Sequence, residues 1–195
     1  YDAPLLDTMI TKETFIEIRQ VMRDFFSPLK SCEAKIKFVF LTGITKFSQL
    51  SIFSELNNLN NISMDNSYSS ICGITKEELQ SEYLKPYVKR FADENEWSLD
   101  EAYLKLKEHY DGYHFSENKV DIFNPYSLVN ALADRRLKNY WFDSGTSSFL
   151  LKSLKLYKFD YTQMDNVSAS RASFDVPTGA MRTAIPLLFQ SGYLT

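Results

Sequence analysis

Many large aromatic rings and few glycines constrain the fold of this chain more than any other feature of its sequence. Among 195 residues there are 15 Phe and 12 Tyr but only 6 Gly. Large rings fill protein cores, whereas glycine supplies the positive φ angles of tight turns. We therefore expect a helix-dominated fold with an aromatic core. Neither G-x-x-x-x-G-K-[ST] nor G-x-G-x-x-G occurs, so the sequence lacks these backbone loops for gripping a nucleotide phosphate.

Composition and charge point to a globular cytoplasmic protein. Hydrophobic residues make up 44% and charged residues 24% of the chain, both close to the average of globular domains. The net charge of -3 provides no overall field that would attract nucleic acid. The apolar run Phe38 to Leu41 is far shorter than the roughly 18 residues of a membrane span. We expect no membrane partner.

Metal binding is not expected, because the usual metal ligands are few and poorly spaced. Cys32 and Cys72 belong to no C-x-x-C motif, and we interpret them as reduced thiols in the core. His109 and His114 lie five residues apart across a turn that contains glycine, not at the i, i+4 spacing of a helical zinc site.

Hydrophobic spacing and capping residues predict several helices. Apolar residues recur every three or four positions from 11 to 29, which indicates an amphipathic helix. Thr75 and Glu78 form a capping-box pattern ahead of a helix over about 75–92, and Ser98 repeats the pattern ahead of a helix over 98–110. Asn124 followed by proline predicts another helix start, with that helix ending near residue 135.

One short apolar run suggests a strand with a ligand site at its end. Residues 38–41, Phe-Val-Phe-Leu, show no alternation, which is typical of a strand buried on both faces of a parallel sheet. Thr42, Thr45 and Lys46 follow at the carboxyl end, where open α/β sheets bind ligands. The alternative is that Thr42 and Gly43 only turn the chain and that Thr45 and Lys46 are solvated.

Two features near the middle of the chain have a functional and a structural interpretation. Arg135, Arg136 and Lys138 form a small basic group that could contact phosphate, or that only complements the dipole at a helix carboxyl end. The aromatic residues between 110 and 142 could stack on bases, but rings interleaved with Leu and Val at helical spacing are more typical of a core.

Several blocks, taken in order, resemble a known family. They are YDAPLLDT, FVFLTGITKFSQLSIFSELNNL, CGITKEEL, YDGYHFS, FNPYSL, NYWFDSGT and FQSGYLT. Together they span nearly the whole chain and are similar to the predicted AAA-type ATPase family, in which a P-loop ATPase-like region precedes a PD-(D/E)XK nuclease-like domain. The resemblance implies that the chain is a fragment of a longer protein, from just after the Walker B acidic pair to the end of a helical lid.

The resemblance also assigns expected roles to individual residues. It places Asp2 directly after the Walker B pair, and Thr42 at the position of a polar sensor near the γ-phosphate, with Thr45 and Lys46 behind it. Asp2, Arg135 and Arg136 are candidates for contact with the cofactor. The longer protein would bind ATP and magnesium, whereas this chain alone, without Walker A and the acidic pair, is expected to hold neither and to be inactive.

We therefore expect an α/β, helix-dominated fold with two parts. Residues 1–70 would be the remnant of a P-loop NTPase-type parallel sheet, and residues 71–195 an all-helical, lid-like region. The expected partners are the P-loop region and the nuclease-like domain of the longer protein, nucleic acid through that protein, and a second copy through an uncovered sheet edge. The alternative function is a non-catalytic helical module that binds a protein or nucleic acid. Steep salt dependence would indicate nucleic acid.

Overall fold

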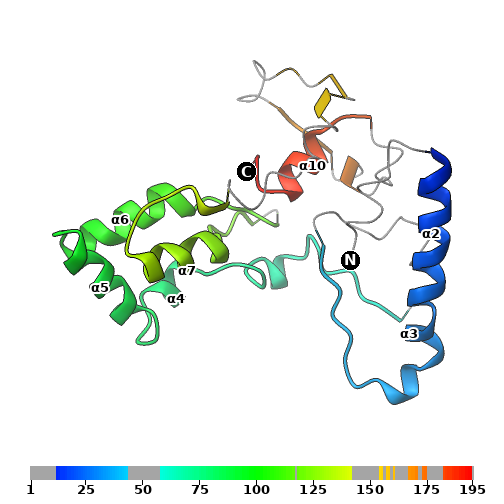
Figure 1. Cartoon of the computed structure of the whole chain (residues 1–195), viewed down its shortest axis with the longest axis horizontal. Coiled ribbons are helices and arrows are strands. Elements are labelled where there is room, and N and C mark those ends of the chain that lie inside the picture. Colours follow the sequence, from blue (N-terminus) through cyan, green and yellow to red (C-terminus); the bar gives the residue numbers. More distant parts are fainter. Residues whose placement is uncertain are drawn as a thin grey trace. The chain divides into compact units, whose positions relative to one another are not determined.

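The computed structural model describes residues 12–43, 58–116, 118–141 and 182–194, with short pieces at 154–155, 157–158, 160, 167–170 and 173–174. Helices dominate the described residues (Figure 1). The chain divides into two compact units, one formed by residues 1–61 and 148–194 and the other by residues 62–147 with Thr195. The predicted helical character is confirmed.

The first unit begins its described part with a long helix, α2 (Lys12–Phe26). Its apolar residues follow helical spacing, and Met22 is buried. Phe25, which the spacing assigns to the core face, is instead 74% exposed. The prediction that Cys32 and Cys72 are core thiols is also wrong, because both residues are exposed. Pro28 occupies the first turn of the short helix α3 (Pro28–Ser31), where its missing N–H leaves no hydrogen bond unmade. The 3-10 turn η1 (Glu33–Lys35) follows.

The carboxyl-terminal part of the same unit contains α10 (Ile185–Gln190). A small apolar cluster surrounds this helix. Its buried members are Leu154, Ala184, Leu187 and Leu188, and Tyr157, Tyr193 and Leu194 pack against them. The rings of Phe174 and Phe189 meet edge to face at 5.5 Å between centroids. Aliphatic and aromatic burial together stabilise this helix, which is too short to be stable alone.

The predicted buried strand over residues 38–41 is not found. These residues form no strand in the structure, and Phe38 and Phe40 are 80% and 48% exposed. Their rings stack at 6.4 Å with an interplanar angle of 6°, which places them on one side of the segment. A strand requires a neighbouring strand for its hydrogen bonds. No backbone hydrogen bond links residues 38–43 to another described segment, so an apolar run alone did not produce a sheet strand here.

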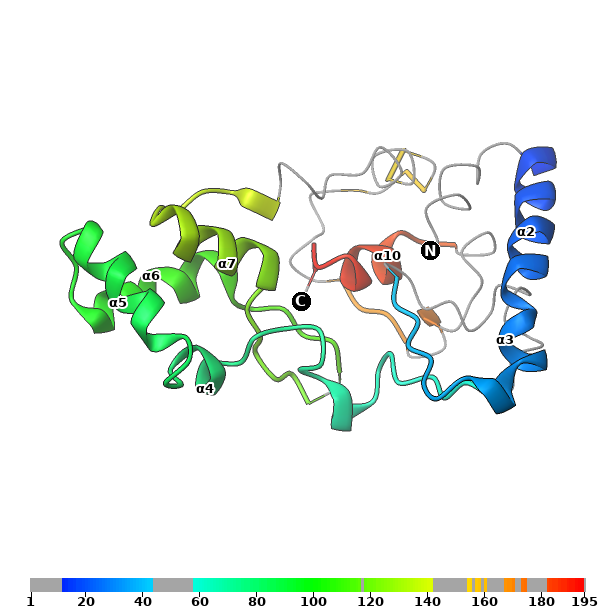
Figure 2. The same ribbon diagram turned by 60° about the horizontal axis from the view of Figure 1, so that its bottom comes forward.

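The second unit has its core between α5 (Lys85–Glu94), α6 (Leu99–Tyr110) and α7 (Pro125–Asp134). The three helices lie side by side in Figures 1 and 2. The core is mainly aliphatic, and Phe91 is fully buried within it. Its buried members are Leu79, Val88, Phe91, Ala92, Ala102, Leu106, Tyr110, Phe123, Leu128, Ala131 and Leu132. This interior holds one unit of the chain together through apolar burial.

The predicted helix over 75–92 is instead two helices, α4 (Lys76–Leu79) and α5. Pro86 explains the break, because its ring in the interior of a continuous helix would clash with the preceding turn and remove a hydrogen bond. The structure tolerates it in the first turn of α5. The capping box of α4 is confirmed, with Glu78 N–H donating to Thr75 Oγ1 at 3.2 Å and Thr75 N–H to Glu78 Oε2 at 2.8 Å.

Two other predicted helix starts are also confirmed. The Ser98 hydroxyl accepts the Glu101 N–H at 3.1 Å, and the Asn124 side chain accepts the Ser127 N–H at 2.9 Å. Two isolated bridges accompany these helices. One pairs Tyr113 with Ile122, between α6 and α7, and the other pairs Ile74, ahead of α4, with Phe123. A short 3-10 turn, η3 (Asn66–Tyr68), precedes them. Within the described residues, no helix is both long and apolar enough to cross a membrane.

Candidate functional site

Thr42, the predicted phosphate sensor, lies in the first unit on the extended segment that follows η1. Thr42 is exposed, and so is Gly43 beside it. No hydrogen bond joins the Thr42 hydroxyl to any described residue. The other predicted residues of this group, Thr45, Lys46 and Asp2, lie outside the described residues.

Arg135 and Arg136 lie together in the second unit, where α7 ends. Arg135 has a left-handed backbone, with φ 57° and ψ 36°. The backbone N–H of Arg135 and that of Arg136 both donate to the carbonyl of Ala131, and the bond from Arg136 is 3.2 Å long. This arrangement satisfies a carbonyl that the helix end would leave without a partner.

The side chain of Arg135 is used in a contact between two helix ends. Its Nη1 donates to Glu94 Oε2 at 3.2 Å, and the two side chains are 49% and 58% exposed. Asn95 adds a second connection, because its amide donates to the carbonyl of Phe91 at 2.7 Å and to that of Arg135 at 3.0 Å. Arg135 therefore joins the end of α7 to the end of α5.

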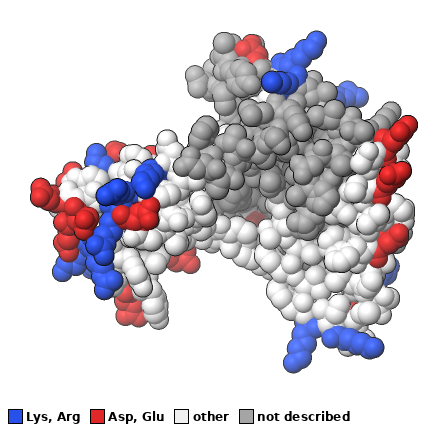
Figure 3. Space-filling view, viewed as in Figure 1, with Lys and Arg blue, Asp and Glu red and all other residues white. Residues whose placement is uncertain are grey.

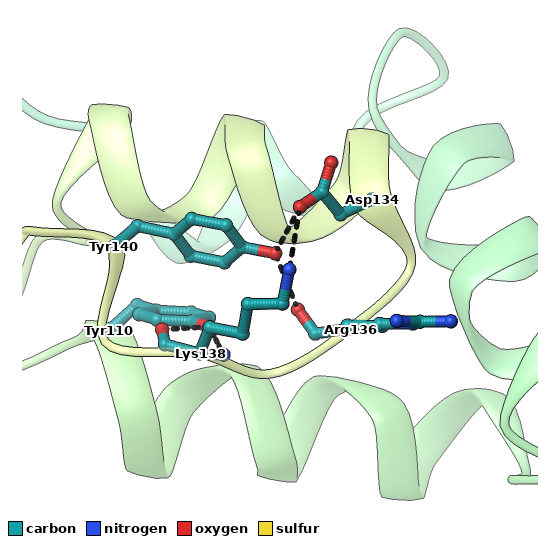
Figure 4. Close-up of polar contacts among 5 residues, drawn as sticks. All are labelled: Tyr110, Asp134, Arg136, Lys138 and Tyr140. Carbon is teal, nitrogen blue, oxygen red and sulfur yellow. Dashed lines mark hydrogen bonds and ion pairs between the residues drawn. The ribbon is translucent and has the colours of Figure 1, made fainter. Parts of the chain in front are cut away.

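The Arg136 guanidinium has no such partner. No hydrogen bond or ion pair connects it to a residue that the structure describes, and the residue is exposed. Figure 4 shows its side chain extending away from the polar group formed by Asp134, Lys138 and Tyr140. Of the two arginines, Arg136 is the one whose cation forms no ion pair with a described residue, although, after the hydrogen bonds of Tyr140 and Lys138, its charge contributes to lowering the pKa of Asp134.

Polar contacts fix the backbone on either side of Arg136 (Figure 4). The Tyr110 hydroxyl donates to the carbonyl of Lys138 and accepts its N–H, both at 2.9 Å. Tyr140 Oη donates to Asp134 Oδ2 at 2.9 Å, and Lys138 Nζ lies 3.3 Å from the same oxygen. These bonds hold the loop after α7 against α6 and against the last turn of α7. They therefore fix the backbone from which the Arg136 side chain extends.

The charge states of this group follow from its contacts. The Tyr140 hydrogen bond, and then that of Lys138, lowers the pKa of Asp134. Burial, followed by the hydrogen bond to Asp134, raises the pKa of Tyr140 to about 12. Burial also raises the pKa of Tyr110. At neutral pH Asp134 is therefore a carboxylate, and Tyr110 and Tyr140 are neutral phenols.

A second polar contact closes the loop between α6 and α7. His114 Nε2 and Asp121 Oδ1 lie 2.5 Å apart, and the His114 side chain is 16% exposed. This pair joins the two arms on either side of the Tyr113 to Ile122 bridge.

Among the described residues, no group of three or more His, Cys, Asp and Glu side chains could hold a metal ion.

The residues that organise this site were only partly visible in the sequence. Arg135 and Arg136 were predicted as phosphate candidates at a helix end, and the helix end is confirmed. The sequence contains no such signal for Glu94, and it places Tyr140 only among the aromatic residues between 110 and 142, which are more typical of a core. Their polar roles depend on contacts across 41 and 6 residues, respectively. The one local signal for Asn95 is its position directly after a helix, where Asn favours a cap.

Comparisons with known proteins locate a family likeness at the start of the chain. A protein from Azotobacter chroococcum mcd 1, described as "Uncharacterized protein in vnfD 5'region", is 33% identical over 198 residues. That alignment covers 100% of this chain and 35% of the relative, so the chain spans about a third of the relative's length. No solved structure matches the chain. The family model described as "Predicted AAA-ATPase" matches residues 1–53, and this part of the chain is similar to that AAA-ATPase-like family.

Proposed function

We propose that this chain is part of an AAA-type ATPase that binds and hydrolyses ATP with magnesium. The observation that carries the proposal is the family match over residues 1–53, which contains Thr42. The helix-dominated structure is consistent with it. In this proposal residues 1–70 contribute to the ATPase core and residues 71–195 form a helical, lid-like region. The phosphate loop and the magnesium carboxylates belong to other parts of the whole protein.

Within that function, Thr42 acts as the polar sensor of the γ-phosphate. An exposed hydroxyl without a partner in the described structure is available to orient a phosphate oxygen or the attacking water. Phosphoryl transfer depends on such positioning, because the transition state requires alignment and charge stabilisation more than covalent chemistry. Thr45 and Lys46 follow it in the sequence and belong to the same proposed site.

Arg136 is the better of the two arginines for contact with phosphate. Arg135 already pairs with Glu94 and carries the left-handed end of α7, whereas the Arg136 guanidinium is unpaired among the described residues. A planar guanidinium matches phosphate oxygens in a bidentate manner, which an ammonium does not.

We further propose that ATP turnover is coupled to a nuclease-like domain that acts on nucleic acid.

The test is steady-state ATP hydrolysis by the whole protein that contains this chain, with magnesium present. Thr42→Ala should lower kcat about tenfold or more with little change in ATP affinity, since one positioning contact is lost. Thr42→Ser retains the hydroxyl and should stay near wild type. Unchanged turnover in Thr42→Ala would remove Thr42 from the sensor role. A wild-type protein that neither binds nor hydrolyses ATP would overturn the proposal.

Arg136 is tested in the same assay. Arg136→Gln should weaken ATP binding or slow hydrolysis, and Arg136→Lys should not restore it fully. The matched control is Lys107→Gln, which removes an exposed cation from α6. Equal effects of the two substitutions would show a general charge effect and would exclude Arg136 from the site.

A further inference from the structure

The outer surface at the start of α5 combines cations with exposed tyrosine rings. We define the α5 patch as Tyr83, Lys85, Tyr87, Lys89 and Arg90. Residues 83–92 contain these three cations and no carboxylate, with Glu82 and Asp93 at the two borders. The second unit as a whole has more acidic than basic residues, so this stretch differs from its surroundings. In Figure 3, blue atoms of Lys and Arg lie over the region of α5 at the left, with red atoms of Asp and Glu beside them.

Burial explains why the patch faces outward. Val88, Phe91 and Ala92 form the inner face of α5 and are at most 2% exposed. Tyr83 and Tyr87 are 76% and 51% exposed, although rings of this size are usually buried. Tyr87 lies in the first turn of α5, and Tyr83 lies in the turn that precedes this helix. The rings are not required for the core.

The three cations form no direct ion pair within the described residues. No carboxylate that the structure describes lies in ion-pair contact with Lys85, Lys89 or Arg90. Of the two carboxylates in the last turn of α5, Asp93 forms no ion pair with these cations, and Glu94 pairs with Arg135. Arg90 instead lies over the ring of Tyr87, with its guanidinium carbon 5.9 Å from the ring centroid.

We propose that the α5 patch binds single-stranded nucleic acid. Unpaired bases have faces that stack on exposed rings, and a phosphate backbone attracts lysine and arginine beside those rings. The Arg90 contact holds a cation next to Tyr87, so one nucleotide can meet a ring and a charge together. Single strands suit the patch better than duplexes, whose bases are already stacked on each other. The patch lies apart from Thr42 and Arg136 in sequence, so this inference does not depend on ATP binding.

The test is fluorescence anisotropy of a labelled oligothymidylate of about 15 nucleotides, titrated with the whole chain in the absence of nucleotide. We expect saturable binding that weakens with salt. With three phosphate contacts, the logarithm of the association constant should fall with the logarithm of salt concentration at a slope of about -2. Lys89→Gln should reduce that slope by about 0.7. A duplex of the same length should bind more weakly.

Ring substitutions separate stacking from charge. Tyr83→Ala and Tyr87→Ala should each weaken binding by about fivefold to a hundredfold, because each ring loses a stacked base. Tyr83→Phe and Tyr87→Phe retain the ring and should bind like wild type. Tyr126→Ala is the matched control, since Tyr126 on α7 is 52% exposed, close to the value for Tyr87. All these side chains are exposed, and thermal unfolding should show that the variants fold.

Three results would overturn the proposal. The first is the absence of binding at low salt. The second is equal loss of affinity in Tyr126→Ala and Tyr87→Ala, which would show that the position of the ring does not matter. The third is binding to duplex DNA or heparin as tightly as to the oligothymidylate, with no dependence on the rings. That result would show a surface for any polyanion. ATP hydrolysis by the whole protein is measured separately and bears on none of these outcomes.

Discussion

The side chain of Asn95 connects the carboxyl end of α5 to the backbone of Arg135, 40 residues later in the chain. Its amide nitrogen donates to the Phe91 carbonyl at 2.7 Å and to the Arg135 carbonyl at 3.0 Å. Both hydrogens of one amide are therefore used, each on a carbonyl at a helix end. This contact fixes the position from which the unpaired Arg136 extends.

The first prediction concerns this contact. Asn95→Ala should lower the free energy of unfolding by about 1 to 2 kcal/mol, because two carbonyls lose their donor. Asn95→Asp should be at least as destabilising, since a carboxylate only accepts hydrogen bonds and carries negative charge at a helix carboxyl end. Urea denaturation measures both.

Asn130 provides the control for Asn95. Its amide makes one local hydrogen bond, to the Tyr126 carbonyl at 2.7 Å. Asn130→Ala should stay within about 0.5 kcal/mol of wild type. If Asn95→Asp were as stable as wild type, Asn95 would not connect the two helices.

The second prediction separates backbone strain from charge at Arg135. Its φ of 57° is unfavourable for any residue with a Cβ atom, at a cost of roughly 1 to 2 kcal/mol. Its exposed ion pair with Glu94 contributes at most about 1 kcal/mol. Arg135→Gly should therefore be more stable than Arg135→Ala by about 1 kcal/mol in urea denaturation. Glu94→Gln removes the ion pair alone, and equal stability of the Gly and Ala variants would contradict the left-handed backbone.

The third prediction is a pH dependence at Tyr140. Its pKa is raised from 10.0 to about 12, so folding favours the neutral phenol. The stability that it contributes is complete below pH 10 and is lost as the pH rises toward 12. Ultraviolet absorbance of ionised tyrosine should show a titration near pH 12 that is missing in Tyr140→Phe. Asp134→Asn should lower the pKa of Tyr140 but leave the elevation that burial, the largest cause, produces.

Asp134 gives the acidic counterpart of this prediction. Its pKa is lowered from 3.8, so its contribution to stability is present above pH 3.8 and is lost as the pH falls through the lower folded value. Tyr140→Phe removes the largest cause and should move the Asp134 pKa upward, as followed by carboxylate NMR chemical shifts. An unchanged value would show that the hydrogen bond is not formed in solution.

The fourth prediction compares two glycines. A Cβ atom on Gly73 would lie 2.3 Å from Ile122 Cδ1 and 2.6 Å from Ile122 Cβ, and Ile122 is only 1% exposed. Gly73→Ala should cost about 1 to 3 kcal/mol by overpacking. Gly112 has open space around it but a φ of 99°, so Gly112→Ala should cost free energy through backbone strain.

A third substitution distinguishes the two causes. Ile122→Ala removes two of the three side-chain atoms nearest the new Cβ of Gly73→Ala, and a double-mutant cycle should show that it lessens the cost there. The same cycle with Gly112→Ala should be additive. Coupling of equal size at both glycines would contradict this explanation.

Local signals in the sequence predicted local structure well. Thr75 and Asn124 cap the helices that they precede, because a cap depends on a few neighbouring residues. The break before α5 was missed, although Pro86 was present in the sequence as its cause. The strand over residues 38–41 was not found, since an apolar run does not reveal whether a neighbouring strand pairs with it.

The candidate site was less accessible to sequence analysis, because its contacts join distant residues. The basic group at the end of α7 was visible as a pattern, but the pattern did not distinguish Arg135 from Arg136. That distinction comes from Glu94 and Asn95, which the fold brings to the end of α7. The exposure of Tyr87, and of Tyr83 just before α5, also depends on which face of α5 packs against the core.

The most direct test of the ATPase proposal is titration of this 195-residue chain with a fluorescent ATP analogue and magnesium. In the proposed function, the phosphate loop and the magnesium carboxylates belong to other parts of the whole protein. We therefore expect no saturable binding by this chain alone. Saturable binding with a Kd of about 1 μM, a binding free energy of about -8 kcal/mol, would contradict it. That result would show that the residues of this chain grip the phosphates themselves.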